Sequence, residues 1–435
     1  MLQTLKDIFS VKDIKKKILY VFFIIVLYRI GSFITVPGIN KIAFMEDFNN
    51  ASNGILGTIN IISGGAFSRL SIFAMTIGPY ITASIILNLL QIVIPSLEKL
   101  AREGETGKKK LAKYTKYLTV AFALVEGVGL YLQYRKFLVG PLLSGAGMIV
   151  GLLLFVSSLM AGTALLMWLS DKITETGLGN GVSMIIFVSI VSRAPAAVSA
   201  LVNYATSLTH VLVLVAFVAA MIALVAGVIF VQQAERRIPV NYAKRVVGRR
   251  MMGGQNTHIP LKVAMAGVIP VIFAMSFMMF PATIIQIVSK GAPTGFWKGV
   301  YDMFSMNTGN VWGLIAYALI YMILILVFTF FYTTIIVNPI EMANGLKKNG
   351  GFIPGIRAGK PTSDYISNVL NNITWAGGFF LALVAVLPIL VQGLMPALKV
   401  SFGGTSILIV VGVALEILKQ LESQMVSRHY KGFID

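Results

Sequence analysis

Ten apolar stretches, each close to the length needed to cross a bilayer, alternate with polar connections along this 435-residue chain. About 20 apolar residues in a helix span the hydrocarbon core, where the helix satisfies its own backbone hydrogen bonds. The pattern therefore predicts an all-α polytopic membrane protein. The ten predicted spans are residues 18–36, 71–94, 117–134, 148–169, 182–202, 211–231, 263–288, 311–337, 373–398 and 404–418.

Positive charge is concentrated on every second connection. Of the 36 Lys and Arg residues, 27 fall in the N-terminal arm, the even-numbered loops and the C-terminal tail, and 7 fall in the odd-numbered loops. Short loops rich in Lys and Arg remain in the cytoplasm. The charge split therefore predicts that both termini are cytoplasmic.

Composition excludes a water-soluble globule. The chain is 57% hydrophobic and 12% charged, whereas charged residues make up about a quarter of a typical soluble domain. The net charge of +19 suits anionic lipid, acidic partner surfaces or ribosomal RNA, and charge alone does not choose among them. There is no cysteine and the three histidines are dispersed, so we expect no disulfide, metal or cofactor.

Ten spans divide into two sets of five, over residues 1–210 and 211–435. Because five is odd, two similar halves would lie in the membrane with opposite orientation. Inverted repeats commonly place the functional path at their interface, near the bilayer midplane. We therefore expect two inverted five-helix halves around a central path.

One segment interrupts this pattern between the first two spans. Residues 57–70, GTINIISGGAFSRL, are apolar but too short to cross the membrane, and they contain two adjacent glycines. Irregular backbone at membrane depth is tolerated where it is buried in protein or lines a cavity. The segment is either a re-entrant piece inside a channel vestibule or an extracellular helix resting on the lipid headgroups.

Few charged residues lie within the spans. Arg29 and Arg193 lie toward the outer ends of their spans, where long side chains can reach the interface. Glu126 is internal, and it is either a structural carboxylate bonded to a neighbouring helix or a functional one. Ion-coupled transporters need ionisable groups near the midplane of the membrane, and few occur in these spans. The sequence also contains no recognisable catalytic motif. We therefore expect no enzyme activity.

Two long cytoplasmic loops, residues 234–262 and 338–370, contain glycines, prolines and apolar patches between their basic residues. A positively charged loop that is only solvated by water does not need glycines, prolines and apolar patches between its basic residues. Ordered hairpins that dock a partner are one interpretation, and solvated positive-inside loops are the other.

Long motifs in these loops and in the spans resemble the SecY family of bacterial protein-translocation channels. They are ERRIPVNYAKRVVGRR with GGQNTHIPLKVAMAGVIPVIFAMSFMMFPATI, GGAFSRLSIFAMTIGPYITASIILNLL, ITETGLGNGVSMIIF and NPIEMANGLKKNGGFIPGIRAGKPT. The resemblance covers essentially the whole chain in order. It implies a channel in the bacterial plasma membrane that passes unfolded secretory polypeptides and releases apolar segments sideways into lipid.

The resemblance also implies partners. These are SecE and SecG as bound subunits, SecA or a translating ribosome on the cytoplasmic side, and preproteins with signal peptides as substrates. No sequence-specific contact with nucleic acid is implied. The chain carries no recognisable nucleotide site, so the work of moving a substrate must come from a partner.

The matched motifs also assign roles to individual residues, including six isoleucines named below. From their spacing alone, these isoleucines would be explained as ordinary helix contacts. The resemblance assigns residues 57–70 to a plug that closes the outer vestibule, which favours the re-entrant interpretation. It assigns the lateral gate to the second, third, seventh and eighth spans. The assigned residues are Ile77, Ile81, Ile186, Ile190, Ile272 and Ile409 in an apolar pore ring, Ile59, Ile62, Gly64, Gly65, Phe67 and Arg69 in the plug, Thr82 and Glu126 in the gate, and Arg249, Arg250 and Arg357 in partner docking.

The rival hypothesis is a secondary transporter of a small solute, which ten spans in inverted halves also permit. Such a transporter would need midplane charge or broken helices aimed at an anion, whereas the path expected here is apolar. A scaffold without transport is a third class, and only a channel should leak ions when its constriction is altered.

Overall fold

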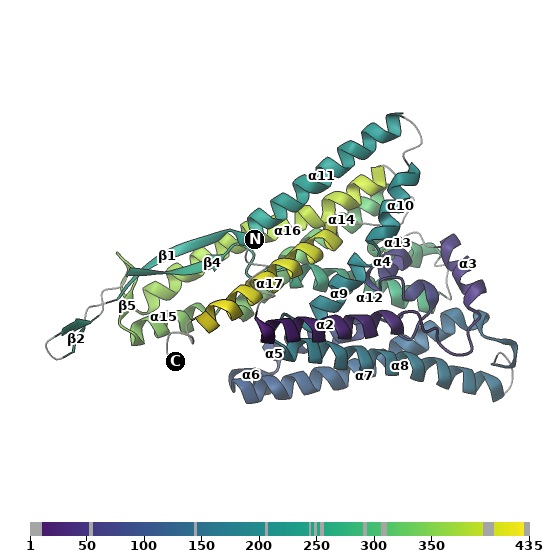
Figure 1. The fold of residues 1–435 in the computed structure, drawn as a ribbon, viewed down its shortest axis with the longest axis horizontal. Helices are drawn as coiled ribbons and strands as arrows, with labels where there is room; N and C mark the ends of the chain where they lie inside the picture. The colour runs from purple at the N-terminus through teal and green to yellow at the C-terminus, as the bar shows by residue number, and fades with distance from the viewer. Residues whose placement is uncertain are drawn as a thin grey trace.

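The computed structural model describes residues 11–51, 55–142, 146–204, 208–242, 245–247, 250–252, 256–289, 294–305, 311–394 and 404–429. Long helices dominate this part of the chain (Figure 1). A small sheet lies at one end of the long axis, and the short helix α3 (Lys41–Ala51) lies near the other end.

Each predicted span coincides with one helix or with a pair of helices. Seven helical stretches of the described residues are long and apolar enough to cross a membrane, and the bent pair α5 and α6 makes an eighth. The other two are α2, which begins in a run of lysines, and α12, whose apolar stretch is shorter. The helices are α2 (Lys12–Gly31), α5 (Gly78–Val93) with α6 (Pro95–Arg102), α7 (Glu105–Tyr134), α8 (Ala146–Glu175), α9 (Gly181–Val191) with α10 (Ala194–Tyr204), α11 (Leu208–Gln233), α12 (Ile269–Val288), α14 (Val311–Ile336), α16 (Lys360–Leu394) and α17 (Gly404–His429).

The helical multi-span fold predicted from the sequence is thereby confirmed, and shorter elements connect the spans. They are α3, α4 (Ile55–Ile62), η1 (Phe67–Arg69), η2 (Arg135–Phe137), η3 (Gly140–Leu142), α13 (Gly295–Phe304) and α15 (Pro339–Lys348).

In two spans, local backbone chemistry explains a difference from the predicted range. Residues 72–77 form turns, with Thr76 at φ 54°, and the second membrane helix begins only at Gly78, with Pro79 in its first turn. The fifth span is broken between α9 and α10, where Pro195 follows. Proline has no N–H to donate and disfavours helical backbone in the preceding residue, so the helix restarts there.

The sheet joins the two long loops that the charge pattern predicts to be cytoplasmic. Strand β1 (Glu235–Tyr242) pairs antiparallel with β4 (Asn256–Lys262) on one edge and with β5 (Gly351–Phe352) on the other. A second hairpin, β2 (Arg245–Val247) with β3 (Arg250–Met252), extends beyond it. Within the described part of the chain, these strands all come from the two long loops, and the predicted spans are helical.

A small apolar core fixes this sheet to the ends of the helices. It combines side chains from β1, β4, α15, the residue after β5 and the start of α16, namely Ile238, Val240, Leu261, Leu346, Ile353, Ile366 and Leu370. The first long loop thus forms a hairpin of β1 and β4, whereas the second adds α15 and the short strand β5 to the same core.

The first and the last described helices, α2 and α17, are joined by a hydrogen bond. Lys17 on α2 donates a hydrogen bond from Nζ to Oε1 of Gln424 on α17 at 3.1 Å. Nε2 of Gln424 donates to the carbonyl of Gly177, in the loop after α8, at 2.7 Å. These contacts place the N-terminal arm, the fourth loop and the C-terminal helix together.

Candidate functional site

The six isoleucines predicted for the pore ring all lie in one cluster of buried hydrophobic side chains. Their exposed fractions range from 0 to 8%. They come from four separate parts of the chain: the start of α5, α9, α12 and α17. Helix α5 contacts α12, and α9 contacts α17, so the fold joins residues far apart in sequence into one apolar centre.

The two isoleucines of α5 keep the spacing expected for one helix face. Ile77 is the N-cap residue, and the Ile81 N–H donates to the Ile77 carbonyl at 3.0 Å. Branched aliphatic side chains offer a passing polypeptide no hydrogen bonds and exclude water when packed together. The cluster therefore has the chemistry of a seal.

The predicted plug segment, residues 57–70, is a compact unit that caps itself. The Phe67 N–H donates to Ser63 Oγ at 3.1 Å, and the Ser68 N–H donates to Asn60 Oδ1 at 3.0 Å. Asn60 and Ser63 are buried and α4 contacts α9. Burial among the helices favours a segment held inside the protein over one resting on headgroups.

The turn at the centre of the plug segment is built from Gly64 and Gly65. Their φ angles of 61° and 86° lie in the left-handed region that glycine adopts without strain. A Cβ on Gly64 would lie 2.9 Å from Ser192 Oγ and 3.0 Å from the Ser189 backbone. Only a residue without a side chain lets the plug approach α9 so closely.

Four polar side chains tie this turn to α2 and α9. The Tyr28 and Ser189 hydroxyls share a hydrogen bond at 2.5 Å, and the Tyr28 hydroxyl also lies 3.4 Å from the Ser63 carbonyl. Arg29 Nη1 donates to the Gly64 carbonyl at 3.2 Å and to Ser192 Oγ at 3.0 Å. We call Tyr28, Arg29, Ser189 and Ser192 the plug clamp.

The plug clamp was missed by sequence reasoning. The position of Arg29 near the outer end of its span predicts that its side chain reaches the interface, whereas the structure shows it donating to the backbone of the predicted plug segment. A tyrosine and an arginine adjacent in an apolar helix are the sequence signal that could have suggested a buried polar contact, because such groups need partners in a low-dielectric setting.

Aromatic rings hold the other side of the plug segment. Phe67 is 2% exposed, and its ring centroid lies 5.9 Å from that of Phe48 and 6.2 Å from that of Tyr134. Phe44 and Phe137 extend this cluster. Of the remaining predicted plug residues, Ile59 and Ile62 are half-buried, and the Arg69 guanidinium lies 4.1 Å from the centroid of the Phe33 ring.

The predicted gate residues lie on α5 and α7, which pack against each other and both contact α12. Thr82 and Glu126 are half-buried. No hydrogen bond joins them within the described part of the chain. Gly127, beside Glu126, packs against Val156 of α8, with 3.4 Å between its Cβ position and Val156 Cγ1, so this region of α7 also has a structural role.

Of the three predicted docking arginines, Arg357 is described in full. Its side chain is exposed, and its carbonyl accepts a hydrogen bond from the buried Thr362 hydroxyl at 2.8 Å. Ile353, four residues earlier, belongs to the loop core. Arg357 thus projects from a fixed turn.

Of the other two predicted docking arginines, one falls in the second hairpin. Arg250 is in β3, and Arg249 lies outside the described residues. At the base of the adjoining β1, Arg237 donates to the Glu235 carboxylate at 2.7 Å, which lowers the pKa of that carboxyl. Among the residues that the structure describes, no three His, Asp or Glu side chains gather so as to hold a metal ion.

Comparison with known sequences gives one family over most of the chain. The SecY family profile matches residues 71–418. The chain is 44% identical to the protein translocase subunit SecY of Streptomyces scabiei and to that of Halalkalibacterium halodurans, in each case over the full length of both chains. It is 42% identical to the same subunit of Mycobacterium bovis, over 97% of each chain.

Solved structures share the fold. One described as a protein conducting channel matches with a TM-score of 0.67 at 19% identity, over 94% of this chain and 92% of that one. A second concerns the plug domain of a SecY protein and its closed state, with a TM-score of 0.65 at 19% identity and the same coverage. Sec61 in a canine ribosome-channel complex matches with a TM-score of 0.62 at 18% identity, again over 94% and 92%.

Proposed function

This chain belongs to the SecY family, and from that premise we propose that it is the pore of a protein-conducting channel. It moves unfolded secretory polypeptides across the bacterial plasma membrane and releases transmembrane segments laterally into lipid. The observation that carries the proposal is that six isoleucines from four parts of the chain are all buried in one hydrophobic cluster. An enzyme needs a reactive constellation, whereas a conduit needs this kind of apolar constriction.

The site assignments are part of the same proposal. The isoleucine cluster is the pore ring, residues 57–70 are the plug, and the contact of α5 and α7 with α12 is part of the lateral gate, with Thr82 and Glu126 on it. Residues 1–210 and 211–435 are the two halves that separate when a chain passes. Support comes from the burial of the ring and from the contacts that bind the plug to α2 and α9.

The partners are SecE and SecG in the membrane and SecA or a ribosome on the cytoplasmic side. Curated relatives at 44% identity are named protein translocase subunits, and a solved structure with the same fold is a ribosome-bound channel. The sheet that unites both long loops supports a docking role, because its own core holds exposed basic side chains such as Arg357 in fixed positions.

Both termini lie in the cytoplasm. The charge split between the loops supports this orientation. The hydrogen bond between Lys17 and Gln424 supports it too, because it brings the start of α2 and the last part of α17 to the same side.

Reconstitution tests the proposed function. The chain is purified with the subunits that bind it and placed in lipid vesicles with a motor ATPase, ATP and a preprotein that bears a signal peptide. We expect the preprotein to become protected from added protease. Accumulation of a small solute without preprotein protection would instead identify the rival small-solute transporter.

A further inference from the structure

Helices α5 and α12 each begin after a stretch of turns, at residues 72–77 and 263–268. Each stretch contains one residue at positive φ, two places before its helix, namely Thr76 at 54° and Gly267 at 59°. The N–H of that residue donates to the carbonyl three positions earlier, at 2.9 Å from Thr76 and 3.1 Å from Gly267. The chain therefore builds the same entry into α5 and into α12.

The amino-acid sequence repeats along with this geometry. Residues 72–81 read IFAMTIGPYI, and residues 263–272 read VAMAGVIPVI. In this alignment a proline is the second residue of each helix, and Ile81 of the proposed ring stands opposite Ile272 of the proposed ring. Helices α5 and α12 are thus matching elements of the two proposed halves.

One helix in each half packs against the entry to its ring-bearing helix. On α8, a Cβ at Gly162 would overlap the carbonyl oxygen of Ile72, the first residue of the turn stretch. On α16, a Cβ at Gly377 would overlap the carbonyl oxygen of Val263, the first residue of the matching stretch. A backbone atom has no rotamer that could relieve the overlap, so both close approaches need glycine. Helices α8 and α16 therefore hold the two stretches at matching points.

The same two helices also receive the first residues of α9 and α17. A Cβ at Gly181, which begins α9, would overlap the Ser170 carbonyl oxygen on α8. A Cβ at Gly404, which begins α17, would overlap the Val384 carbonyl oxygen on α16. Each of these glycines lies five residues before a predicted ring isoleucine. All four ring-bearing helices thus begin at a close glycine contact with α8 or α16.

From this repeated arrangement we propose that Gly162, Gly181, Gly377 and Gly404 are positioning residues for the pore ring. Helices α8 and α16 set where the ring isoleucines of their halves lie. A methyl group at any of the four glycines pushes the start of a ring-bearing helix away from its support. Because the interior is close-packed, the shift carries along the helix to its isoleucines. The inference rests on the proposed function, since it concerns the proposed ring.

Gly162→Ala and Gly377→Ala test the inference in the full chain, purified with its bound subunits. In planar bilayers we expect the resting ion conductance to rise severalfold in each variant, because a displaced ring no longer excludes water. Hydrogen exchange separates the two halves. Gly162→Ala should speed exchange over residues 72–81 only, and Gly377→Ala over residues 263–272 only, whereas a general loss of stability would affect both ranges.

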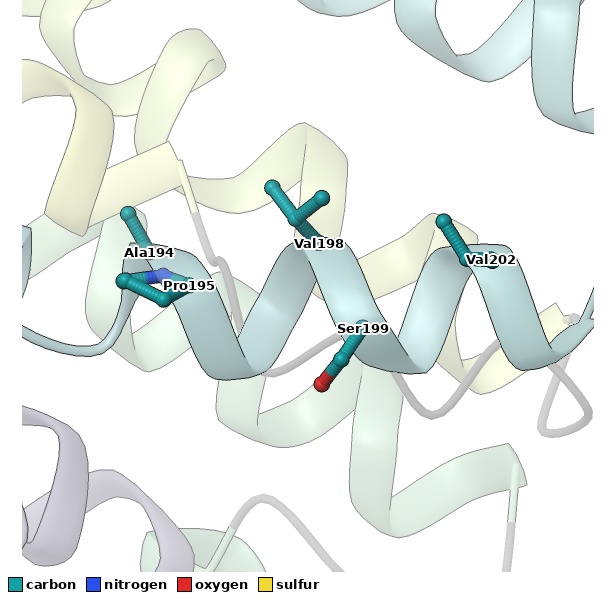
Figure 2. Close-up of a pocket in the computed structure, with 5 residues that line it drawn as sticks. All are labelled: Ala194, Pro195, Val198, Ser199 and Val202. Atoms are coloured by element: carbon teal, nitrogen blue, oxygen red, sulfur yellow. The ribbon is translucent and has the colours of Figure 1, made fainter.

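Two control variants should leave the ring in place. Gly227→Ala adds the same methyl group to α11, where its Cβ position lies 4.0 Å from Phe380 Cζ, an ordinary contact. Val198→Ala changes α10, which follows α9 in the same predicted span. Figure 2 shows Val198 and Val202 on one side of α10, where they line an open groove, and Val198 is 58% exposed. Both variants should keep the conductance and the exchange of the unmodified chain.

A fifth glycine provides a variant that can be rescued. A Cβ at Gly412 on α17 would overlap Cγ2 of Val268, the last residue of the stretch before α12. Gly412→Ala should therefore leak. Val268→Ala removes the overlapping methyl group, so the double variant should return the conductance toward baseline. This pair decides the question even where a variant with a backbone overlap does not assemble.

Three results would overturn the inference. They are baseline conductance in assembled Gly162→Ala and Gly377→Ala, exchange that rises equally in both halves, and a leak from Gly412→Ala that persists in the double variant. The proposed function has a separate readout, which is preprotein protection by the unmodified chain in vesicles. The half-specific exchange does not depend on that readout, so failure of the inference and failure of the proposed function are distinguishable.

Discussion

Tyr28 on α2 and Ser189 on α9 share a hydrogen bond of 2.5 Å across 161 positions of sequence. Ser189 is adjacent to Ile190 of the apolar ring, and Tyr28 also lies 3.4 Å from the plug carbonyl of Ser63. One polar contact therefore joins the first span, the ring-bearing α9 and the plug. Because all three groups are buried, loss of any one leaves its partners without compensation by water.

Tyr28→Phe should loosen the plug while it keeps the packing of the ring. The change removes the hydrogen bond between two buried hydroxyls and weakens the contact with the Ser63 carbonyl, which costs about 1–3 kcal/mol, so we expect faster hydrogen exchange over residues 57–70 and higher ion conductance of the resting channel. Tyr20→Phe on the exposed face of the same helix is the control. Equal exchange in the two variants would show that the hydroxyl does not hold the plug.

Ile81→Ser and Ile190→Ser should make the closed channel leak ions. Each change places a hydroxyl in the apolar cluster and shortens a side chain, so the constriction widens and admits water. Planar-bilayer conductance measures the effect. The control is Ile92→Ser, because Ile92 lies on α5 and is 60% exposed; this variant should leave the conductance at baseline. A leak of equal size from Ile92→Ser would contradict a specific ring.

Gly64→Ala should displace the plug. An alanine in the left-handed region costs about 1–2 kcal/mol, and here its Cβ would also meet the Ser189 backbone at 3.0 Å. The control is Gly295→Ala, with a similar φ of 59° and open space around its Cβ position. We expect the leak only from Gly64→Ala. If both variants leak alike, backbone strain, and not the close contact with Ser189, displaces the plug.

Arg357→Glu should block export driven by a motor ATPase. If Arg357 pairs with a partner group, the reversal should cost roughly 2–5 kcal/mol of binding free energy, typical of a broken interfacial charge pair. Lys347→Glu makes the same change of net charge at an exposed position of α15, and its export defect should be much milder. Preprotein protection in vesicles measures both, and equal defects would show that only the net loop charge matters.

Cysteine labelling tests the orientation in this cysteine-free chain. Exposed positions Lys109 and Lys348, changed singly to Cys, should react with an impermeant thiol reagent from the cytoplasmic side only. Lys298 in α13, changed to Cys, should react from the outside only. Reversed labelling at any of these positions would require a different arrangement of spans.

The sequence by itself determined the class, the number and the order of the spans. Apolar length and the asymmetry of Lys and Arg are local properties of the chain, and lipid imposes helices on any apolar stretch that crosses it. The long motifs added the family, and with it the candidate ring, plug and docking residues. The ordered character of the long loops was also predictable, since their apolar patches need a core of their own.

Tertiary structure alone decided how those parts are joined. No local pattern around Arg29 indicates that its guanidinium reaches Gly64 and Ser192, because those partners lie 35 and 163 positions away. The same holds for β5 against β1, where the two strands come from different loops. Contacts between distant segments depend on how helices pack in three dimensions. The plug clamp therefore became visible only in the folded chain.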